Sequence, residues 1–392
     1  MDILKGVRVV DFGQLTAGAN TSAMLADLGA EVIKIESHSY MDLFRHVGPR
    51  TAADWWNRSP PFQFTNRNKQ GVALDLKQPE GRRLAGELIA RSDIVVENYR
   101  RDVLDGLGLG YARMRALNPA IVYASISSQG ETGPYRMHRS FGSTLEAMGG
   151  LSAITGYGDT GPRVTGGDVN YPDQVVSLIA AGFILAALRQ ARRSGLGAHL
   201  DISQREVVAF LLGEQIMAAA ADPARTDPGP QGNAEEGLLL QDCFVGADGR
   251  WIAISIADAP AAERARAIVG AGPDEDLHAA ITRWRLARPG ADAVAQLIDG
   301  GVQAAPVNDG MDLLGNPDLT GCTLARDAAG GLVKGMPYRF GEAAMTIARA
   351  APDLGQHTEA VLSRMLGLDG AELAHLAALG VTAADPTRKE FA

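Results

Sequence analysis

Residues 7–36 read VRVVDFGQLTAGANTSAMLADLGAEVIKIE, in which a helix pattern lies between two strand patterns. The strand patterns, 7–12 and 31–35, are short and rich in β-branched residues. A loop of small residues at 16–21 leads into an amphipathic segment at 22–28. Gly29 stands where a left-handed C-terminal cap would end that helix. The stretch therefore predicts one strand–helix–strand unit.

The same alternation continues through the first third of the chain. Further strand patterns lie at 72–76, 94–96 and 121–125, with helix patterns at 79–91 and 102–117. Such alternation is typical of a parallel sheet with helices on both faces. We therefore predict an α/β fold whose large domain is Rossmann-like.

The character of the sequence changes beyond Glu206. Residues 217–227 are rich in Ala, Asp and Pro, and strand patterns at 238–245 and 251–256 then flank a tight Asp-Gly turn, as in a hairpin. These features predict a large domain over 1–216, a linker over 217–235, a smaller α+β domain over 236–320, and a return linker with the C-terminal part of the large domain over 321–392.

Composition excludes several classes of protein. The 392 residues carry 37 Lys+Arg and 46 Asp+Glu, and a net charge of −9 disfavours nucleic-acid binding. The two cysteines, Cys243 and Cys322, are far apart, so we expect neither a disulfide framework nor a thiolate zinc site. The seven histidines show no pair at metal-ligand spacing, and we expect no metal.

The sequence predicts a cytoplasmic protein that has no membrane partner. The N-terminus lacks the basic and apolar segments of a secretory signal. The longest apolar run, 175–188, is shorter than the roughly 20 residues that cross a bilayer, and it is interpreted as a buried core helix.

Two segments could carry chemistry. The loop at 13–21 lacks the G-x-G-x-x-G spacing, so a plain strand-to-helix turn is favoured over a nicotinamide dinucleotide site, although Glu36 stands near the position of a ribose-binding acid. Asp173 directly precedes the apolar helix. Local sequence favours an N-cap there, but the helix dipole would also keep its carboxylate ionised, as a nucleophile requires. Asp168 is interpreted as a loop residue.

Several stretches in series resemble one known family. The chain is similar to the class III coenzyme A transferases, which include formyl-CoA transferase and carnitine CoA-transferases and share a superfamily with alpha-methylacyl-CoA racemase. The matching segments are residues 4–11, 25–36, 66–69, 74–81, 93–99, 185–188, 194–197 and 352–358.

The resemblance implies a catalytic residue and a set of coenzyme A contacts. In the family one aspartate attacks the acyl-CoA thioester, at a fixed distance before a Gly-x-Gly; Asp173 keeps that distance from Gly195-Leu196-Gly197, whereas Asp168 lies five positions too early. An interlocked homodimer is also implied. The implied coenzyme A contacts are Thr16, Ala17, Leu74, Lys77, Asn98, Tyr99, Arg100 and Arg139.

Departures from the family pattern argue against some of the substrates and reactions found in the family. Ser37 and Gly106 stand where related proteins carry arginine, so phosphate binding is expected to be rearranged. Residues 232–237 replace the glycine-rich loop of formyl-CoA transferases, which disfavours a formyl or oxalyl substrate. Phe141 stands where racemases carry a histidine.

The resemblance thus implies transfer of coenzyme A from an acyl-CoA to a carboxylic acid through a covalent aspartyl intermediate. Coenzyme A would be a substrate, and no permanently bound cofactor is expected. The alternatives are an acyl-CoA racemase or isomerase with the same aspartate as acid/base, a non-catalytic coenzyme A-binding subunit, and, on residues 13–36 alone, a nicotinamide dehydrogenase.

Overall fold

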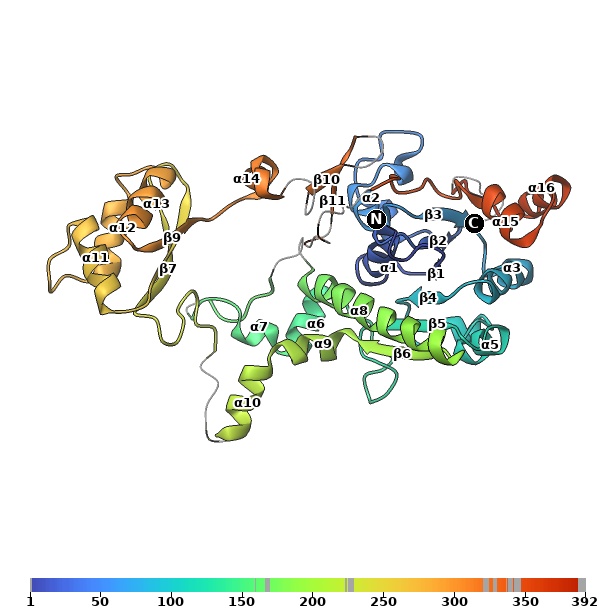
Figure 1. The fold of residues 1–392 in the computed structure, drawn as a ribbon, viewed down its shortest axis with the longest axis horizontal. Helices are drawn as coiled ribbons and strands as arrows, with labels where there is room; N and C mark the ends of the chain where they lie inside the picture. The colour runs from blue at the N-terminus through green and yellow to red at the C-terminus, as the bar shows by residue number, and fades with distance from the viewer. Residues whose placement is uncertain are drawn as a thin grey trace. The chain divides into compact units, whose positions relative to one another are not determined.

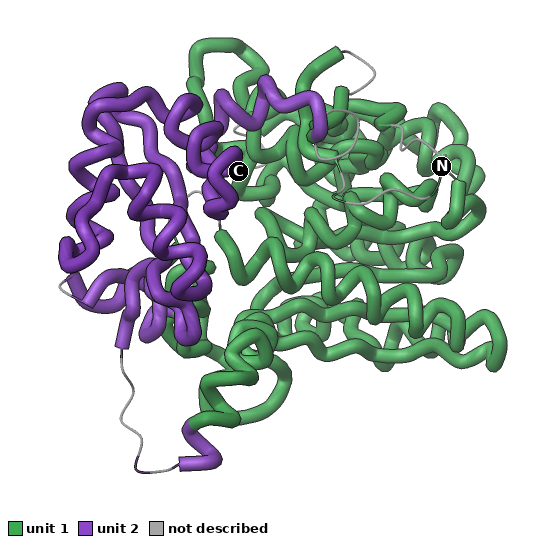
Figure 2. The backbone as a smooth tube through the Cα atoms, turned by 60° about the vertical axis from the view of Figure 1, so that its left-hand side comes forward, with its two compact units in different colours: residues 1–151, 165–218, 319–392 green, residues 152–164, 219–318 purple. Residues whose placement is uncertain are grey.

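The computed structural model describes residues 2–158, 160–165, 170–222, 224, 229–319, 324–326, 330–335, 337, 341 and 347–386 (Figure 1). It divides into two compact units (Figure 2): residues 1–151, 165–218 and 319–392 form unit 1, and residues 152–164 and 219–318 form unit 2. The sequence analysis placed 152–164 in the large domain and began the small domain at 236. Contacts within the chain instead group 152–164 and 219–235 with unit 2.

Unit 1 is built on a parallel sheet of strand order β3-β2-β1-β4-β5-β6. This is the Rossmann order, and its topological switch point lies between β1 and β4, where ligands bind at the carboxyl ends of the strands. The α/β fold is therefore confirmed. The strands are β1 (Arg8–Asp11), β2 (Glu31–Glu36), β3 (Gln70–Ala73), β4 (Ile94–Glu97), β5 (Val122–Ser127) and β6 (Ala198–Ser203).

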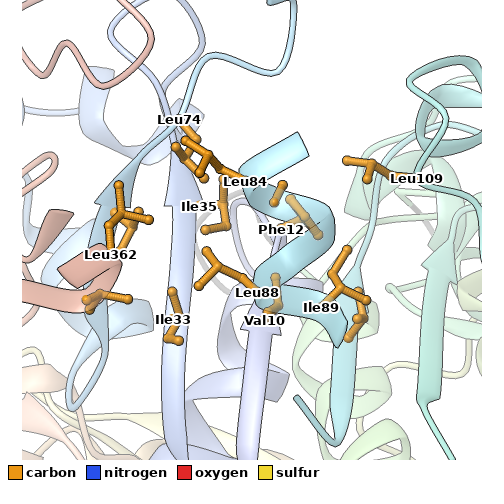
Figure 3. Close-up of a cluster of buried hydrophobic side chains, with 14 of the residues drawn as sticks. Val10, Phe12, Ile33, Ile35, Leu74, Leu84, Leu88, Ile89, Leu109 and Leu362 are labelled. Carbon is orange, nitrogen blue, oxygen red and sulfur yellow. The ribbon is translucent and has the colours of Figure 1, made fainter. Parts of the chain in front are cut away.

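Successive strand residues face opposite sides of the sheet and build two cores. Val9 packs in one core with helices α1 (Ala17–Asp27) and α8 (Tyr171–Ser194). Val10 packs in the other (Figure 3). The helices of this second face are α3 (Pro79–Ala90), α4 (Val103–Gly106), α5 (Tyr111–Leu117), α15 (Thr358–Leu366) and α16 (Gly370–Ala378).

The remaining elements are shorter. The others between residues 1 and 222 are the 3-10 helices η1 (Leu43–His46) and η2 (Trp55–Asn57) and the helices α2 (Pro60–Asn66), α6 (Gly142–Gly149), α7 (Leu151–Ile154), α9 (Gln204–Leu211) and α10 (Gly213–Ala221). A hairpin of β10 (Leu324–Arg326) and β11 (Leu332–Lys334) also belongs to unit 1. Unit 2 pairs β7 (Leu240–Val245), β8 (Trp251–Ile256) and β9 (Gln303–Pro306), and its helices are α11 (Ala259–Val269), α12 (Leu277–Arg285), α13 (Gly290–Asp299), α14 (Gly310–Gly315) and η3 (Pro317–Leu319).

Three sequence expectations about helices were wrong. Thr16 is the N-cap of α1, and residues 17–21 form its first turns rather than a loop. Gly18 has no room for a side chain, because a Cβ there would stand 2.6 Å from Asn98 Oδ1 and 2.7 Å from Gly13 Cα. The helix expected over 102–117 is interrupted at Gly108, whose φ is +71°. Helix α10 continues to Ala221, inside the expected linker.

The helix after Asp173 is longer than expected. Helix α8 spans 24 residues, and by length and composition alone it could cross a membrane, so the argument from a short apolar run does not hold. Its side chains Val176, Ala180, Ile184 and Leu188 are nevertheless buried in the core on the sheet. Burying a valine, isoleucine or leucine side chain stabilises a fold by about 1.5–3 kcal/mol, and the smaller alanine contributes less. Helix α8 is thus packed as a core helix.

Candidate active site

Asp173 lies in the first turn of α8, but it is not the N-cap. That position belongs to Asn170, whose φ of 46° is left-handed and whose side chain makes no capping bond. Pro172, which has no N–H to leave unpaired, occupies the second helical position. The Ser177 hydroxyl donates to the backbone carbonyls of Asp173 (2.6 Å) and Ala17 (3.1 Å) and so fixes this turn against α1. Asp168 lies outside the described residues.

The two oxygens of the Asp173 carboxylate have different surroundings. Oδ1 accepts a hydrogen bond from Gln204 Nε2 at 2.5 Å. Oδ2 lies 3.5 Å from the point where a Cβ on Gly142 would stand, and Asn170 Oδ1 lies 3.1 Å from the same point. Gly142 is the first residue of α6, so Oδ2 lies close to the amino end of that helix.

Burial raises the pKa of Asp173 to about 6, and the Gln204 hydrogen bond opposes that rise only in part. Loss of solvent thus acts against the ionised form that the helix dipole is expected to favour. At pH 7 the ionised form still prevails by about ten to one. The structure thus presents a carboxylate that is charged, poorly solvated and more basic than an ordinary aspartate.

The loop between β1 and α1 passes the topological switch point and is held by side chains. Gly13 N donates to Asp11 Oδ1 at 2.7 Å, and Lys34 Nζ donates to Gly13 O at 2.5 Å. The Asn98 amide bonds both backbone groups of Gln14, at 2.7 and 2.9 Å. Asn98, expected to contact coenzyme A, thus clamps the loop that ends at Thr16.

Buried ion pairs lie beneath this loop. Lys69 Nζ is 2.8 Å from Asp11 Oδ2, and Lys34 Nζ is 3.1 Å from Asp42 Oδ2, with all four side chains at most 1% exposed. Burial lowers the pKa of Lys69 to about 8, although Asp11 opposes it. Burial also acts against Lys34, but Asp42 and Asp11 outweigh it and raise that pKa.

Glu36, the residue expected to bind ribose in a nicotinamide dinucleotide site, is already bonded to other groups. Both carboxylate oxygens of Glu36 accept hydrogen bonds from Arg45 at 2.8 Å. Although burial disfavours the charged form, the Arg45 guanidinium lowers the pKa of Glu36 to about 2. Asp42 N also donates to Oε1, and the residue is 5% exposed, so little of this carboxylate is left to bind the hydroxyls of a ribose.

A cavity of about 760 Å³ brings together five of the eight expected coenzyme A contacts. They come from the ends of β3 and β4 and from the loop before α6: Leu74, Lys77, Tyr99, Arg100 and Arg139. The same cavity is lined by Ser37 and Gly106, the two positions that lack the usual arginines. Tyr40, which the sequence analysis missed, also lines it and packs edge-to-face with Tyr99, with ring centroids 6.2 Å apart.

Lys77 and Arg139 are both exposed at this cavity. We expect Lys77→Ala and Arg139→Ala each to raise the KM for acyl-CoA about 10- to 100-fold. The reason is that a charge-assisted contact with phosphate is worth roughly 1.5–3 kcal/mol. Steady-state kinetics at low salt would measure the effect, which should shrink at high salt. Lys5→Ala is the matched control, since its side chain is 81% exposed and lies outside the cavity. An unchanged KM in both variants would refute the assignment.

A second cavity, of about 830 Å³, adjoins the start of α8. Thr16, Asn170 and Gln174 line it, so it reaches both the loop at the switch point and the residues that flank Asp173. Ala17, by contrast, is 1% exposed within α1. The far wall of this cavity comes from the β10–β11 hairpin, which no sequence motif connected with Asp173.

Comparison with known proteins identifies the family of the chain. Residues 4–358 match the family model described as CoA-transferase family III, and the chain therefore belongs to that family. It is 30% identical to a succinate–glutarate CoA-transferase of Agrobacterium fabrum, over 92% of this chain and 95% of that protein. It is also 30% identical to a succinyl-CoA–D-citramalate CoA-transferase of Chloroflexus aurantiacus, over 96% of this chain and 97% of that protein.

Two further matches bear on length and fold. A probable CoA-transferase of Mycobacterium tuberculosis is 31% identical over 95% of this chain, which spans only 49% of that relative. The crystal structure of a CAIB/BAIF family protein from Brucella suis superposes with a TM-score of 0.84 at 29% identity, covering 92% of this chain and 99% of that one.

Proposed function

We propose that this protein transfers coenzyme A from an acyl-CoA to a carboxylic acid, and that Asp173 is the nucleophile. The observation that carries the proposal is the Asp173 carboxylate itself: one oxygen is bonded to Gln204, the other faces Gly142, and no charged group among the described residues stabilises it. The names of the two full-length relatives support short dicarboxylic acids as the substrate class.

The reaction follows from the chemistry of a carboxylate nucleophile. Asp173 Oδ2 attacks the thioester carbonyl and expels coenzyme A as a thiolate, which leaves a mixed anhydride. The thiolate then attacks the aspartyl carbonyl of the anhydride, releases the donor acid and leaves an aspartyl thioester. The acceptor carboxylate attacks that thioester, expels the coenzyme A thiolate again and gives a second anhydride. The returning thiolate attacks its acceptor carbonyl, which forms the new acyl-CoA and restores Asp173.

The start of α6 supports each tetrahedral state. The first N–H groups of a helix have no acceptor within it, and those of α6 begin at Gly142, opposite Oδ2. Such donors stabilise negative charge that develops on an oxygen during acyl transfer. Because every step exchanges one activated acyl bond for another, the sequence of steps is nearly balanced in energy.

A racemase would need a second acid/base opposite Asp173. Phe141 directly precedes Gly142 at the start of α6, and a phenyl ring cannot exchange a proton. Gln204 and Asn170, which lie near the carboxylate, do not titrate at physiological pH either. These features favour the transferase over the racemase.

We also propose that the chain forms a homodimer. Large apolar side chains on α8, α9 and α10 are exposed, including Phe183 (58%), Phe210 (77%) and Met217 (69%). Exposed apolar side chains gathered on neighbouring helices are typical of protein–protein interfaces. The mass of the protein in solution, measured by light scattering, would test this.

The transfer activity is tested with a panel of acyl-CoA donors and carboxylic acid acceptors, with mass spectrometry of the coenzyme A products.

For the covalent step, we expect succinyl-CoA alone to leave an adduct on Asp173, because a carboxylate nucleophile gives an anhydride or an aspartyl thioester. Both are acylating species, so hydroxylamine should convert the adduct to a hydroxamate and borohydride should reduce it to an alcohol. Peptide mass spectrometry locates the mark, and enzyme treated with free succinate is the control. Turnover with no trappable mark on the Asp173 peptide would argue against covalent catalysis.

A further inference from the structure

The second cavity has the composition of a pocket for a short acyl chain. Much of its wall is apolar and includes Phe44, Phe64 and Leu332. Its polar side includes Asn170 and Gln174, which flank Asp173 on α8. Asn170 Oδ1 and Asp173 Oδ2 lie 3.1 and 3.5 Å from one common point, the Cβ position of Gly142, so the Asn170 side chain stands between the carboxylate and this cavity. An acyl group bonded to Asp173 would therefore start beside this cavity.

Lys334 of β11 brings a positive charge into these apolar surroundings. Its Nζ donates to Gln174 Oε1 at 2.7 Å and lies 4.6 Å from the centroid of the Phe64 ring. No carboxylate lies within ion-pair distance of Nζ among the described residues, whereas Lys34 and Lys69 each pair with a buried aspartate. Burial, together with Arg67, lowers the pKa of Lys334 to about 8, so the ammonium form still predominates at pH 7.

The other cation at this cavity is already engaged. Arg58 Nε donates to Asp54 Oδ2 at 3.0 Å, and its side chain is 69% exposed. Because Arg58 already has a carboxylate partner, a second one adds little to it, whereas an ammonium beside apolar groups gains most from a carboxylate that replaces its lost water. Lys334 is therefore the better anchor for an anion.

We propose that this cavity receives an acyl chain that carries a second carboxylate, and that Lys334 binds that distal carboxylate while the other end reacts at Asp173. The proposal rests on the function proposed above and adds to it the residue that selects a dicarboxylic substrate. Dicarboxylic acids of four or five carbons and their mono-thioesters have this chemistry. A monocarboxylic chain of equal length would leave the Lys334 ammonium without a counter-charge.

The test compares two acyl-CoA substrates of equal carbon number. Exchange between succinyl-CoA and isotope-labelled succinate, and between butyryl-CoA and labelled butyrate, is followed by mass spectrometry. We expect Lys334→Met to lower kcat/KM for succinyl exchange about 10- to 100-fold and to leave butyryl exchange within about twofold. Lys334→Arg, which keeps the charge, should recover most of the succinyl exchange, and Lys5→Met is the surface control.

The possible outcomes separate the two proposals. An equal loss of both exchanges in Lys334→Met, or no loss of either, would overturn the assignment of Lys334. Butyryl exchange without succinyl exchange in the unchanged enzyme would overturn the dicarboxylate pocket and leave the transferase standing. No exchange with any acyl-CoA in the unchanged enzyme would overturn the proposed function itself, and this inference with it.

Discussion

Replacing Asp173 with asparagine should lower the rate of coenzyme A transfer by at least about 10⁴-fold, because loss of a catalytic nucleophile costs that much or more. Asparagine has nearly the same shape, and its amide oxygen can still accept the 2.5 Å hydrogen bond from Gln204. It carries no charge, however, and cannot form an anhydride. Isotope exchange between an acyl-CoA and its labelled acid gives the rate, and thermal unfolding shows whether the fold is kept.

Two control variants make this result specific. Glu80→Gln removes an exposed carboxylate of α3, far along the sequence from α8, and should leave transfer unchanged. Asp168→Ala removes the neighbouring candidate and should retain most activity. If Asp168→Ala were inactive and Asp173→Asn active, the assignment of the nucleophile would be wrong.

The second large effect is expected on stability. Lys69→Met removes a fully buried ammonium that bonds Asp11 Oδ2 at 2.8 Å, Ala19 O at 2.7 Å and Asn66 Oδ1 at 2.8 Å. Removing one member of a buried ion pair costs about 3–5 kcal/mol, and here Asp11 loses its bonded counter-charge and keeps only the electrostatic interaction with Lys34. The midpoint of denaturant unfolding should therefore fall markedly, as followed by circular dichroism.

A double variant shows whether the unpaired charge is the cause. Lys69→Met combined with Asp11→Leu removes both charges, and stability should partly recover relative to Lys69→Met alone. Additive losses in the double variant would instead indicate that packing and the other hydrogen bonds of the two residues dominate, among them the bond from Gly13 N to Asp11 Oδ1. A loss below about 1 kcal/mol in the single variant would contradict the expectation.

The strands could be predicted because each carries its own local signal. The β-branched runs around Val9, Val32 and Val95 identified three strands within a few residues, and Gly29 ended α1 with a φ of 98°, as expected. Parallel strands with helices between them then restrict the topology. The start of α1 was missed because its small residues resemble a loop, and only the contact of Gly18 with Asn98 explains them.

The sequence pointed to a candidate site only in part. Spacing singled out Asp173, and five of the eight positions expected to contact coenzyme A line one cavity. Lys334 and Gln174 are separated by 160 positions, so no local pattern connects them. The pairing of Lys69 with Asp11 likewise depends on the folded sheet, because a buried lysine and a surface lysine look alike in sequence.

The helices near the C-terminus have a consequence for synthesis on the ribosome. Val361, Leu362 and Leu373 complete the same core as Leu84 and Leu88 of α3, although unit 2 is translated in between. At a translation rate of about 5–20 residues per second, roughly 10 to 50 s pass between the synthesis of α3 and that of α15. During that interval the nascent chain presents an uncovered apolar face of its sheet. Chaperones that bind such surfaces would have their main task in this protein before its last helices emerge.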